Sequence, residues 1–279
     1  PKVQDYVFSV VDNILKENPG VAYFKWDCNS PITNIYSPYL RQNQGNLYVD
    51  YVRGLYNVLH RIAAKYPHVP MMLCSGGGAR CDYEALKYFT EFWCSDNTDP
   101  FERIYIQWSM SKFFPVKAMA SHVTEWNKNT SMKFRLDVAS MCKLGFDIDM
   151  ASLSQTDYKL CQQAVANYDR LKPVILDGDM FKLVSPYEGN HAAVNYVTKD
   201  KKSAVVFAYD LHPRYKEPVL NLKLQGLDPT LTYNVNEINL ADGQEGLSGS
   251  FTGDYLMKIG LPLFSPVDGS SRVIELTAM

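Results

Sequence analysis

The sequence lacks the features of several protein classes. No two cysteines have the spacing Cys-x-x-Cys, and neither a His-Glu-x-x-His motif nor a histidine cluster occurs, so the sequence offers no zinc site. No apolar run reaches the roughly 18 residues that a membrane-spanning helix needs. The 28 basic and 30 acidic side chains leave a net charge of −2, and this near-neutral balance gives no basic field for nucleic acid or an anionic membrane. We therefore expect no metal, no cofactor, no nucleic-acid partner and no membrane partner.

What remains is an ordinary globular composition. The chain has 279 residues, of which 46% are hydrophobic, so it has enough apolar material for a full core. The six cysteines lie mainly within apolar runs, which predicts free thiols that pack as small hydrophobic side chains. The first residue is Pro1 rather than Met, and from this we expect the chain to be part of a longer product.

Helical and extended patterns alternate along the first 170 residues. Apolar residues at helical spacing predict helices at 2–17, 47–65, 82–88, 100–113, 131–143 and 154–171. Short apolar runs between them predict strands at 21–24, 69–73, 89–93, 116–121 and 146–150. Strands that alternate with helices in this way indicate an α/β fold with a parallel sheet.

The pattern changes after about residue 176. Short strands separated by turn residues are predicted at 193–197, 204–209, 219–224, 231–235 and 272–276. This texture indicates an antiparallel β-sandwich. We therefore predict two domains, residues 1–176 and residues 177–279.

Polar residues gather where the predicted parallel strands end. Lys25 and Asp27 end the first strand, a Cys74–Gly78 run follows the second, and Asp96 follows the third. Because the carboxyl ends of parallel strands meet at one edge, we expect these residues to share a pocket. Two carboxylates beside tryptophans, Asp27 and Asp96, suit glycoside hydrolysis. On spacing alone, each also fits a helix cap or an ion pair.

The glycine run at Gly76–Gly78 is open to three interpretations. It could hold a phosphate, but it lacks the Gly-Lys-Ser/Thr ending of a P-loop. It could form a tight turn between a strand and a helix. We favour a third interpretation, in which the missing side chains let a ligand approach the backbone closely.

Three segments together resemble glycoside hydrolase family 36, the bacterial-type α-galactosidases. They are Tyr23–Asn29, Cys74–Arg80 and Trp93–Asp99, which contain Lys-Trp-Asp-x-Asn, Cys-Ser-Gly-Gly-Gly and Trp-x-Ser-Asp-x-Thr-Asp. The resemblance extends over about residues 1–175. It implies a (β/α)8 TIM barrel, of which this chain holds about strands 4–8, followed by the C-terminal antiparallel β-sandwich.

The resemblance also implies a retaining α-galactosidase. Asp27 would be the nucleophile at the end of the fourth barrel strand, and Asp96 the acid/base at the end of the sixth. The substrate would be an oligosaccharide with terminal α-linked galactose, of the melibiose or raffinose type. The residues that the resemblance assigns to substrate binding are Lys25, Trp26, Asn29, Cys74, Ser75, Gly76, Gly77 and Trp93.

Strands 1–3 of such a barrel are absent from the sequence. We therefore expect a partial barrel with open edges, and a truncated, non-catalytic fragment stays an alternative to an active enzyme. A galactosyl-transferring relative is a second alternative. A third is an α-N-acetylgalactosaminidase, but Cys74 on the side of the sugar 2-position argues against it.

The sequence is compatible with a homo-oligomer. For the compartment, we expect the bacterial cytoplasm or periplasm.

Overall fold

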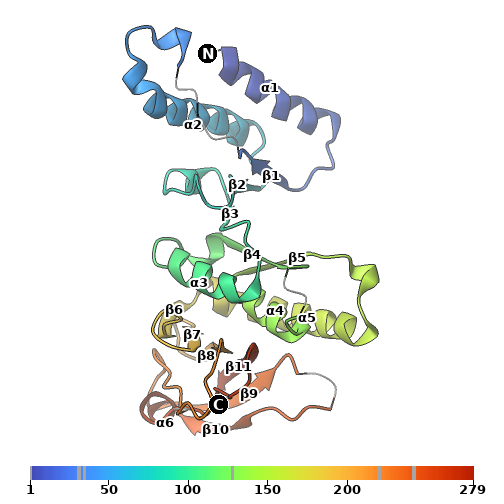
Figure 1. Ribbon diagram of the computed structural model, residues 1–279, viewed down its shortest axis with the longest axis vertical. Coiled ribbons are helices and arrows are strands. Elements are labelled where there is room, and N and C mark those ends of the chain that lie inside the picture. The colour runs from blue at the N-terminus through green and yellow to red at the C-terminus, as the bar shows by residue number, and fades with distance from the viewer. Residues whose placement is uncertain (1, 30–32, 34–35, 127–128, 219–220, 241–242) are drawn as a thin grey trace. The chain divides into compact units, whose positions relative to one another are not determined.

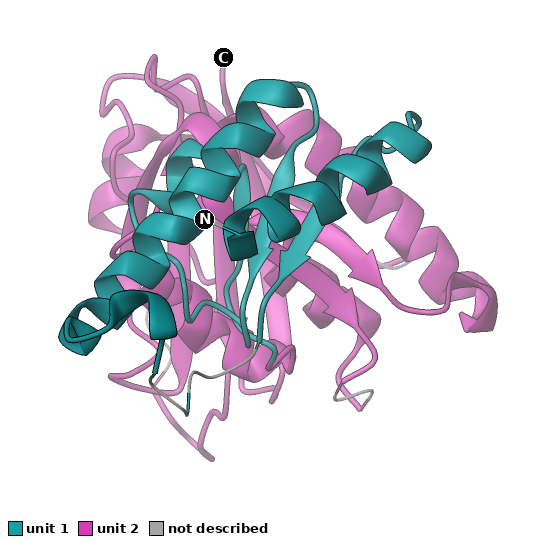
Figure 2. Ribbon diagram, turned by 90° about the horizontal axis from the view of Figure 1, so that it is seen from above, with its two compact units in different colours: residues 1–96 teal, residues 97–279 magenta. Residues whose placement is uncertain are grey.

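The computed structural model of the chain describes residues 2–29, 33, 36–126, 129–218, 221–240 and 243–279 (Figure 1). It divides into two compact units, residues 1–96 and residues 97–279 (Figure 2). Among the described residues, none of the helices is long and apolar enough to span a bilayer. All six cysteines are free, as the sequence predicts.

The first unit contains three parallel strands and two long helices. The strands lie in the order β1 (Phe24–Asp27), β2 (Met71–Cys74) and β3 (Glu91–Trp93). The helices α1 (Lys2–Glu17) and α2 (Leu47–Lys65) pack against each other (Figure 1). Their buried residues recur at helical spacing and form the apolar stripe that drives this packing: Val11 and Leu15 on α1, and Val58, Leu59 and Ile62 on α2.

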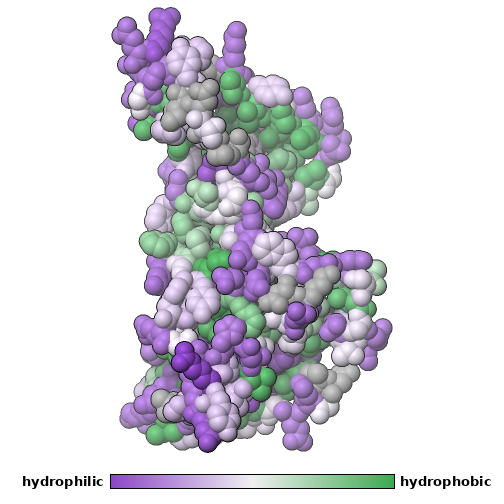
Figure 3. Space-filling view, viewed as in Figure 1, coloured by the Kyte–Doolittle hydropathy of each residue, from purple (hydrophilic) through white to green (hydrophobic). Residues whose placement is uncertain are grey.

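Helix α1 also carries apolar side chains on its outer side. Val3 and Tyr6 are 74% and 70% exposed, and Val10 and Ile14 are about 40% exposed. Figure 3 shows hydrophobic side chains at the surface of this unit. The amphipathic pattern of α1 is therefore only partly satisfied by α2.

The second unit begins with a helical layer and two parallel strands. The helices are α3 (Pro100–Met110), α4 (Met132–Ser140) and α5 (Gln155–Asp177). The strands β4 (Met119–Thr124) and β5 (Lys143–Asp147) pair in parallel. With the three strands of the first unit, the described residues form five strands of the parallel type.

A six-stranded antiparallel sheet forms the rest of the second unit. Its order is β10-β9-β11-β8-β7-β6, made of β6 (Asp179–Val184), β7 (His191–Val197), β8 (Ser203–Asp210), β9 (Thr232–Ile238), β10 (Ser248–Thr252) and β11 (Ser270–Ala278). One face packs against leucines of the short helix α6 (Gly253–Lys258) and of the segments beside it. On the other face, the hydroxyls of Tyr196 and Tyr209 donate to backbone carbonyls of Met141 and Asp137. Both faces are thus covered, which explains the nearly continuous burial of β7 and β8.

The structure confirms the alternation of helices and strands and corrects its details. The predicted helix at 82–88 is wrong, because that segment holds only the 3-10 turn Ala85–Lys87. The first strand begins at Phe24 rather than at residue 21. Of the predicted strand 219–224, residues 219 and 220 lie outside the described residues, and the rest forms a single bridge between Leu222 and Leu261. Strands β6 and β10 were not predicted.

Candidate functional site

Two charged side chains share one face at the end of β1. Successive strand residues point to opposite faces, so Lys25 and Asp27 lie together and Trp26 lies on the other face. Lys25 Nζ is 3.9 Å from Asp27 Oδ2, and both side chains are partly exposed. The Trp26 ring instead lies beside Phe24, with 6.3 Å between the ring centroids. Strand alternation therefore separates Trp26 from the two charged residues.

Trp93 connects the end of β1 to the end of β3. Its indole Nε1 donates a hydrogen bond to Asp96 Oδ1 at 3.0 Å. The Lys25 ammonium lies 5.2 Å from the centroid of the Trp93 ring. Because Trp93 is buried, its ring supports Lys25 and holds one oxygen of Asp96 in place.

Cys74 lies between the two carboxylates. The strand register pairs it with Asp27, whose side chain also forms a hydrogen bond with it. Its Sγ donates to Asp96 Oδ1 across 3.9 Å. Burial raises the pKa of the Cys74 thiol, and the negative charge of Asp27 raises it further, so the group stays a protonated donor at neutral pH.

Taken in order, these pairwise contacts connect five residues in a closed ring, and both carboxylates border the same surface. We call it the carboxylate ring, and its members are Lys25, Asp27, Cys74, Trp93 and Asp96. Asp27 and Asp96 are both exposed to solvent, while Cys74 and Trp93 are buried beneath them. A cation, two carboxylates and a thiol donor in this arrangement suit a polar, hydroxyl-rich ligand and acid–base chemistry.

The glycine run has two different uses. Gly76 and Gly77 both have positive φ, at 55° and 78°. A Cβ on Gly77 would lie only 2.7 Å from Ser95 Cα, whereas a Cβ on Gly76 would meet nothing within 4 Å. Gly77 therefore lets the loop after β2 pack against the loop that carries Asp96. Gly76 is the glycine that leaves open space, as the ligand-approach interpretation expects.

Ser75 and Asn29 join the loop after β1 to the loop after β2. The Ser75 hydroxyl donates to the carbonyl of Cys28 at 2.9 Å. The Asn29 side-chain oxygen accepts from the Gly76 amide at 2.5 Å. Both residues therefore fix the backbone on either side of the carboxylate ring.

The second aspartate of the third motif has a structural role. Asp99 is the N-cap of α3, and its carboxylate accepts from the amides of Phe101 and Glu102 at 2.9 and 3.4 Å. Further along α3, Gln107 is buried and donates to the carbonyl of Val138. The end of this motif thus begins and anchors a helix.

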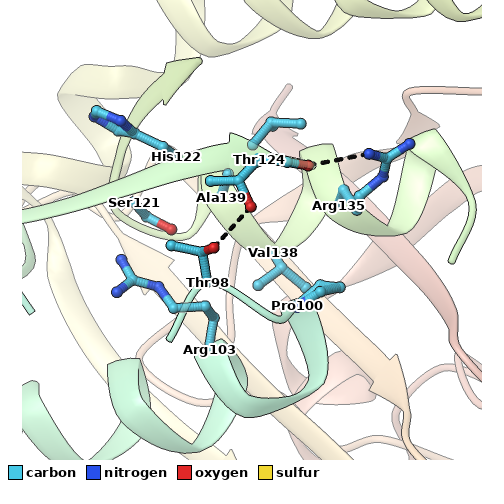
Figure 4. A pocket seen from close by; sticks show the side chains of 10 residues that line it. Thr98, Pro100, Arg103, Ser121, His122, Thr124, Arg135, Val138 and Ala139 are labelled. Atoms are coloured by element: carbon cyan, nitrogen blue, oxygen red, sulfur yellow. Dashed lines mark hydrogen bonds between the residues drawn. The ribbon is translucent and has the colours of Figure 1, made fainter. Parts of the chain in front are cut away.

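Figure 4 shows a small cavity within the second unit, beside β4. Thr124 donates to Thr98 at 2.8 Å, and Arg135 donates to the carbonyl of Thr124 at 3.1 Å. The cavity volume is about 10 Å³, the space of roughly one water molecule. It is too small for a sugar. His122 also lines it, and its ring lies over Gly145, where an added Cβ would meet the ring unless the His122 side chain moved.

In the part of the chain that the structure describes, no group of three or more His, Cys, Asp or Glu side chains is placed to hold a metal ion.

Two family models match the chain. Residues 1–178 match the model described as Melibiase, and residues 191–276 match the glycosyl hydrolase family 36 C-terminal domain. Alpha-galactosidase 1 of Pediococcus pentosaceus is 34% identical over 286 residues, an alignment that covers 99% of this chain and 37% of that protein. This chain therefore spans little more than a third of the relative's length.

Solved structures that resemble this chain are also family 36 alpha-galactosidases. The GH36 alpha-galactosidase AgaB from Geobacillus stearothermophilus superposes with a TM-score of 0.91 at 32% identity, covering 100% of this chain and 38% of that one. A variant of AgaA from the same organism, solved in complex with raffinose, gives the same TM-score, identity and coverage.

Proposed function

The chain belongs to glycoside hydrolase family 36, and on this premise we propose that it supplies the catalytic carboxylates of a retaining α-galactosidase. Asp27 is the nucleophile and Asp96 the acid/base. One observation carries the assignment: Cys74 contacts both carboxylates, so the two acids border one surface. Retaining glycosidases place their two carboxyl groups about 5–5.5 Å apart across such a surface.

The reaction runs in two steps. Asp27 attacks the anomeric carbon, the bond to the leaving oxygen breaks, and Asp96 gives that oxygen its proton. A water molecule then attacks the anomeric carbon of the covalent intermediate. Asp96 takes the proton of this water, and the bond to Asp27 breaks, which releases galactose with its original anomeric configuration.

We propose a different task for each oxygen of Asp96. Oδ1 accepts from the Trp93 indole and from the Cys74 thiol. We therefore assign the transferred proton to Oδ2. The Lys25 ammonium lies beside Asp27 as a counter-ion and is placed to donate to sugar hydroxyls.

We propose an oligosaccharide with terminal α-linked galactose as the substrate. The relatives carry the name alpha-galactosidase, and the AgaA variant was solved with raffinose. The open space at Gly76 leaves room for the sugar. Cys74, which the family resemblance places on the side of the sugar 2-position, disfavours an N-acetyl group there. Ser75, Asn29 and Gly77 act here by fixing the surrounding loops. Direct sugar contacts by these three residues, by Trp26 and by Trp93 stay predictions.

We propose the division into domains at residues 1–176 and 177–279, because one family model ends at residue 178, close to this boundary, and the other begins at residue 191. The first domain would then hold both catalytic acids. The chain spans 37% of its relative's length. The second candidate is therefore that this chain folds but does not catalyse the hydrolysis of α-galactosides.

The test of the proposal follows hydrolysis of p-nitrophenyl α-galactoside by this chain, with AgaA as the positive control. We expect Asp27→Asn to lower kcat by at least about 10⁴-fold and Asp96→Asn to lower it by about 10²–10⁴-fold. Asp50→Asn is the matched control, because Asp50 is an exposed helix residue paired with Arg53.

Azide separates the two roles. Azide added to Asp96→Asn attacks the galactosyl-enzyme without a base and should yield α-galactosyl azide. Azide added to Asp27→Gly replaces the nucleophile and should yield the β-azide. Release of β-galactose as the first product by the unaltered chain would contradict retention. An inactive chain beside active AgaA would favour the second candidate function.

A further inference from the structure

Arg80 links the ends of two neighbouring strands in the first unit. Its Nη1 donates to the backbone carbonyl of Cys28 and to the hydroxyl of Ser75. The same nitrogen lies 3.3 Å from Cys28 Sγ. One guanidinium therefore contacts the loop after β1 and the loop after β2 at once.

The position of the Cys28 backbone affects the position of Asp27, because Cys28 directly follows this proposed nucleophile. Its amide donates to the carbonyl of Cys74 at 3.2 Å and extends the pairing of β1 with β2 by one bond. Its carbonyl accepts from both Arg80 and Ser75. Both backbone polar groups of the residue after Asp27 are thus bonded, and a charged donor makes one of these bonds.

Helix α2 holds the Arg80 side chain in turn. The guanidinium carbon lies 5.7 Å from the centroid of the Tyr51 ring, in cation–π contact. The planar guanidinium can face this ring and still direct its N–H groups at two acceptors. A lysine ammonium cannot reproduce that combination.

We propose that Arg80 is a positioning residue that fixes the orientation of the Asp27 carboxylate through the Cys28 carbonyl and Ser75. This inference rests on the proposed function of Asp27. Arg80 acts on the loops rather than on the reacting atoms. A nucleophile displaced by about 1 Å loses on the order of 10²-fold in rate.

The first test measures rate per folded site. A fluorinated galactoside that labels Asp27 covalently counts the competent sites by mass spectrometry. We expect Arg80→Ala and Arg80→Lys to lower kcat per labelled site by about 10²-fold, with KM changed much less. Arg61→Ala is the matched control, because Arg61 also lies over a ring, Phe8, and pairs with Asp5.

The choice of leaving group separates positioning of the nucleophile from help to the acid. A 2,4-dinitrophenyl galactoside leaves without a proton, so Asp96→Asn should recover much of its rate on it. Arg80→Ala should lower kcat by the same factor on the dinitrophenyl galactoside, the nitrophenyl galactoside and melibiose. Millimolar guanidinium ion should restore part of the kcat that Arg80→Ala loses. It should leave the kcat of Arg61→Ala unchanged.

Amide hydrogen exchange gives a readout without turnover. We expect Arg80→Ala to speed exchange at the Cys28 amide, while Arg61→Ala leaves it unchanged. An active chain in which Arg80→Ala keeps its rate per site overturns the positioning role alone. A chain without α-galactosidase activity overturns the proposed function, and with it this inference.

Discussion

Gly76 and Gly77 share a left-handed backbone, yet their surroundings differ. Both φ values are positive, so an alanine at either site bears a cost of about 1–2 kcal/mol from the backbone alone. At Gly77 the added Cβ also meets Ser95 Cα at 2.7 Å and the Asp96 amide at 3.1 Å. These are backbone atoms, which cannot move aside as a flexible side chain can.

We therefore expect Gly77→Ala to lower the free energy of unfolding by about 1–3 kcal/mol more than Gly76→Ala does. Urea unfolding followed by circular dichroism measures the difference, with Gly76→Ala as the control for backbone strain. Gly77→Ala should also lower kcat, because the clash displaces the loop that carries Asp96. Equal losses of stability in the two variants would contradict the close packing of these loops.

At the residue scale, the sequence predicts which side chains gather but not how they touch. Asp27 and Cys74 end β1 and β2, and Asp96 follows β3, so parallel pairing is enough to predict that they meet. The hydrogen bond from Trp93 to Asp96 depends on a side-chain rotamer, which no spacing encodes. Arg80 lies within the segment Cys74–Arg80, which resembles the family, but its contact with the Cys28 carbonyl depends on the three-dimensional fold and no spacing predicts it.

At the element scale, Asp12 joins α1 to the end of α2. Its carboxylate lies 2.6 Å from Lys16 Nζ and 2.5 Å from Lys65 Nζ, and it accepts from the Tyr66 hydroxyl at 2.6 Å. These partners, Lys16 first and then Lys65, hold the pKa of Asp12 well below its usual range. The carboxylate is therefore more acidic in the folded chain than in the unfolded one.

The sign of the pH dependence follows from that difference. A carboxylate with a lowered folded pKa contributes its stability above the unfolded pKa of about 3.9 and loses it as the pH falls further. We expect Asp12→Asn to lower the midpoint of thermal unfolding at pH 7 and to weaken its dependence on pH below about 4. Asp5→Asn is the control, because Asp5 forms one exposed pair with Arg61. Equal changes of the unfolding midpoint in Asp12→Asn and Asp5→Asn would contradict a stabilising role of the Asp12 carboxylate.

Element prediction succeeded where one periodicity dominated. The helices at 2–17 and 47–65 have clear apolar stripes, and the structure confirms both to the residue. Strand β1 begins three residues later than predicted, because pairing with β2 rather than the apolar run at 21–24 sets its limits. Strand β10 was missed because its sequence, Ser248–Thr252, is mostly polar and exposed at the edge of the sheet.

At the scale of the whole molecule, one buried charge joins α4 to the six-stranded sheet. Asp137 is fully buried. Its carboxylate lies 2.6 Å from Lys133 Nζ and accepts from Asn239 Nδ2 at 2.8 Å and from Ser271 Oγ at 2.7 Å. The first partner lies on α4, the second follows β9, and the third is on β11. The network therefore crosses the boundary that we propose between residues 176 and 177.

Removal of this carboxylate should leave an ammonium, an amide and a hydroxyl without their common partner. We expect Asp137→Ala to lower the free energy of unfolding by about 3–5 kcal/mol, against about 0–1 kcal/mol for Asp169→Ala, whose exposed carboxylate pairs with Lys172. Urea unfolding measures both variants. If Asp137→Ala yields no folded protein, Ser271→Ala, which removes one hydrogen bond, should still cost about 1 kcal/mol. A stability loss for Asp137→Ala no larger than that of Asp169→Ala would show that the network does not hold the two parts together.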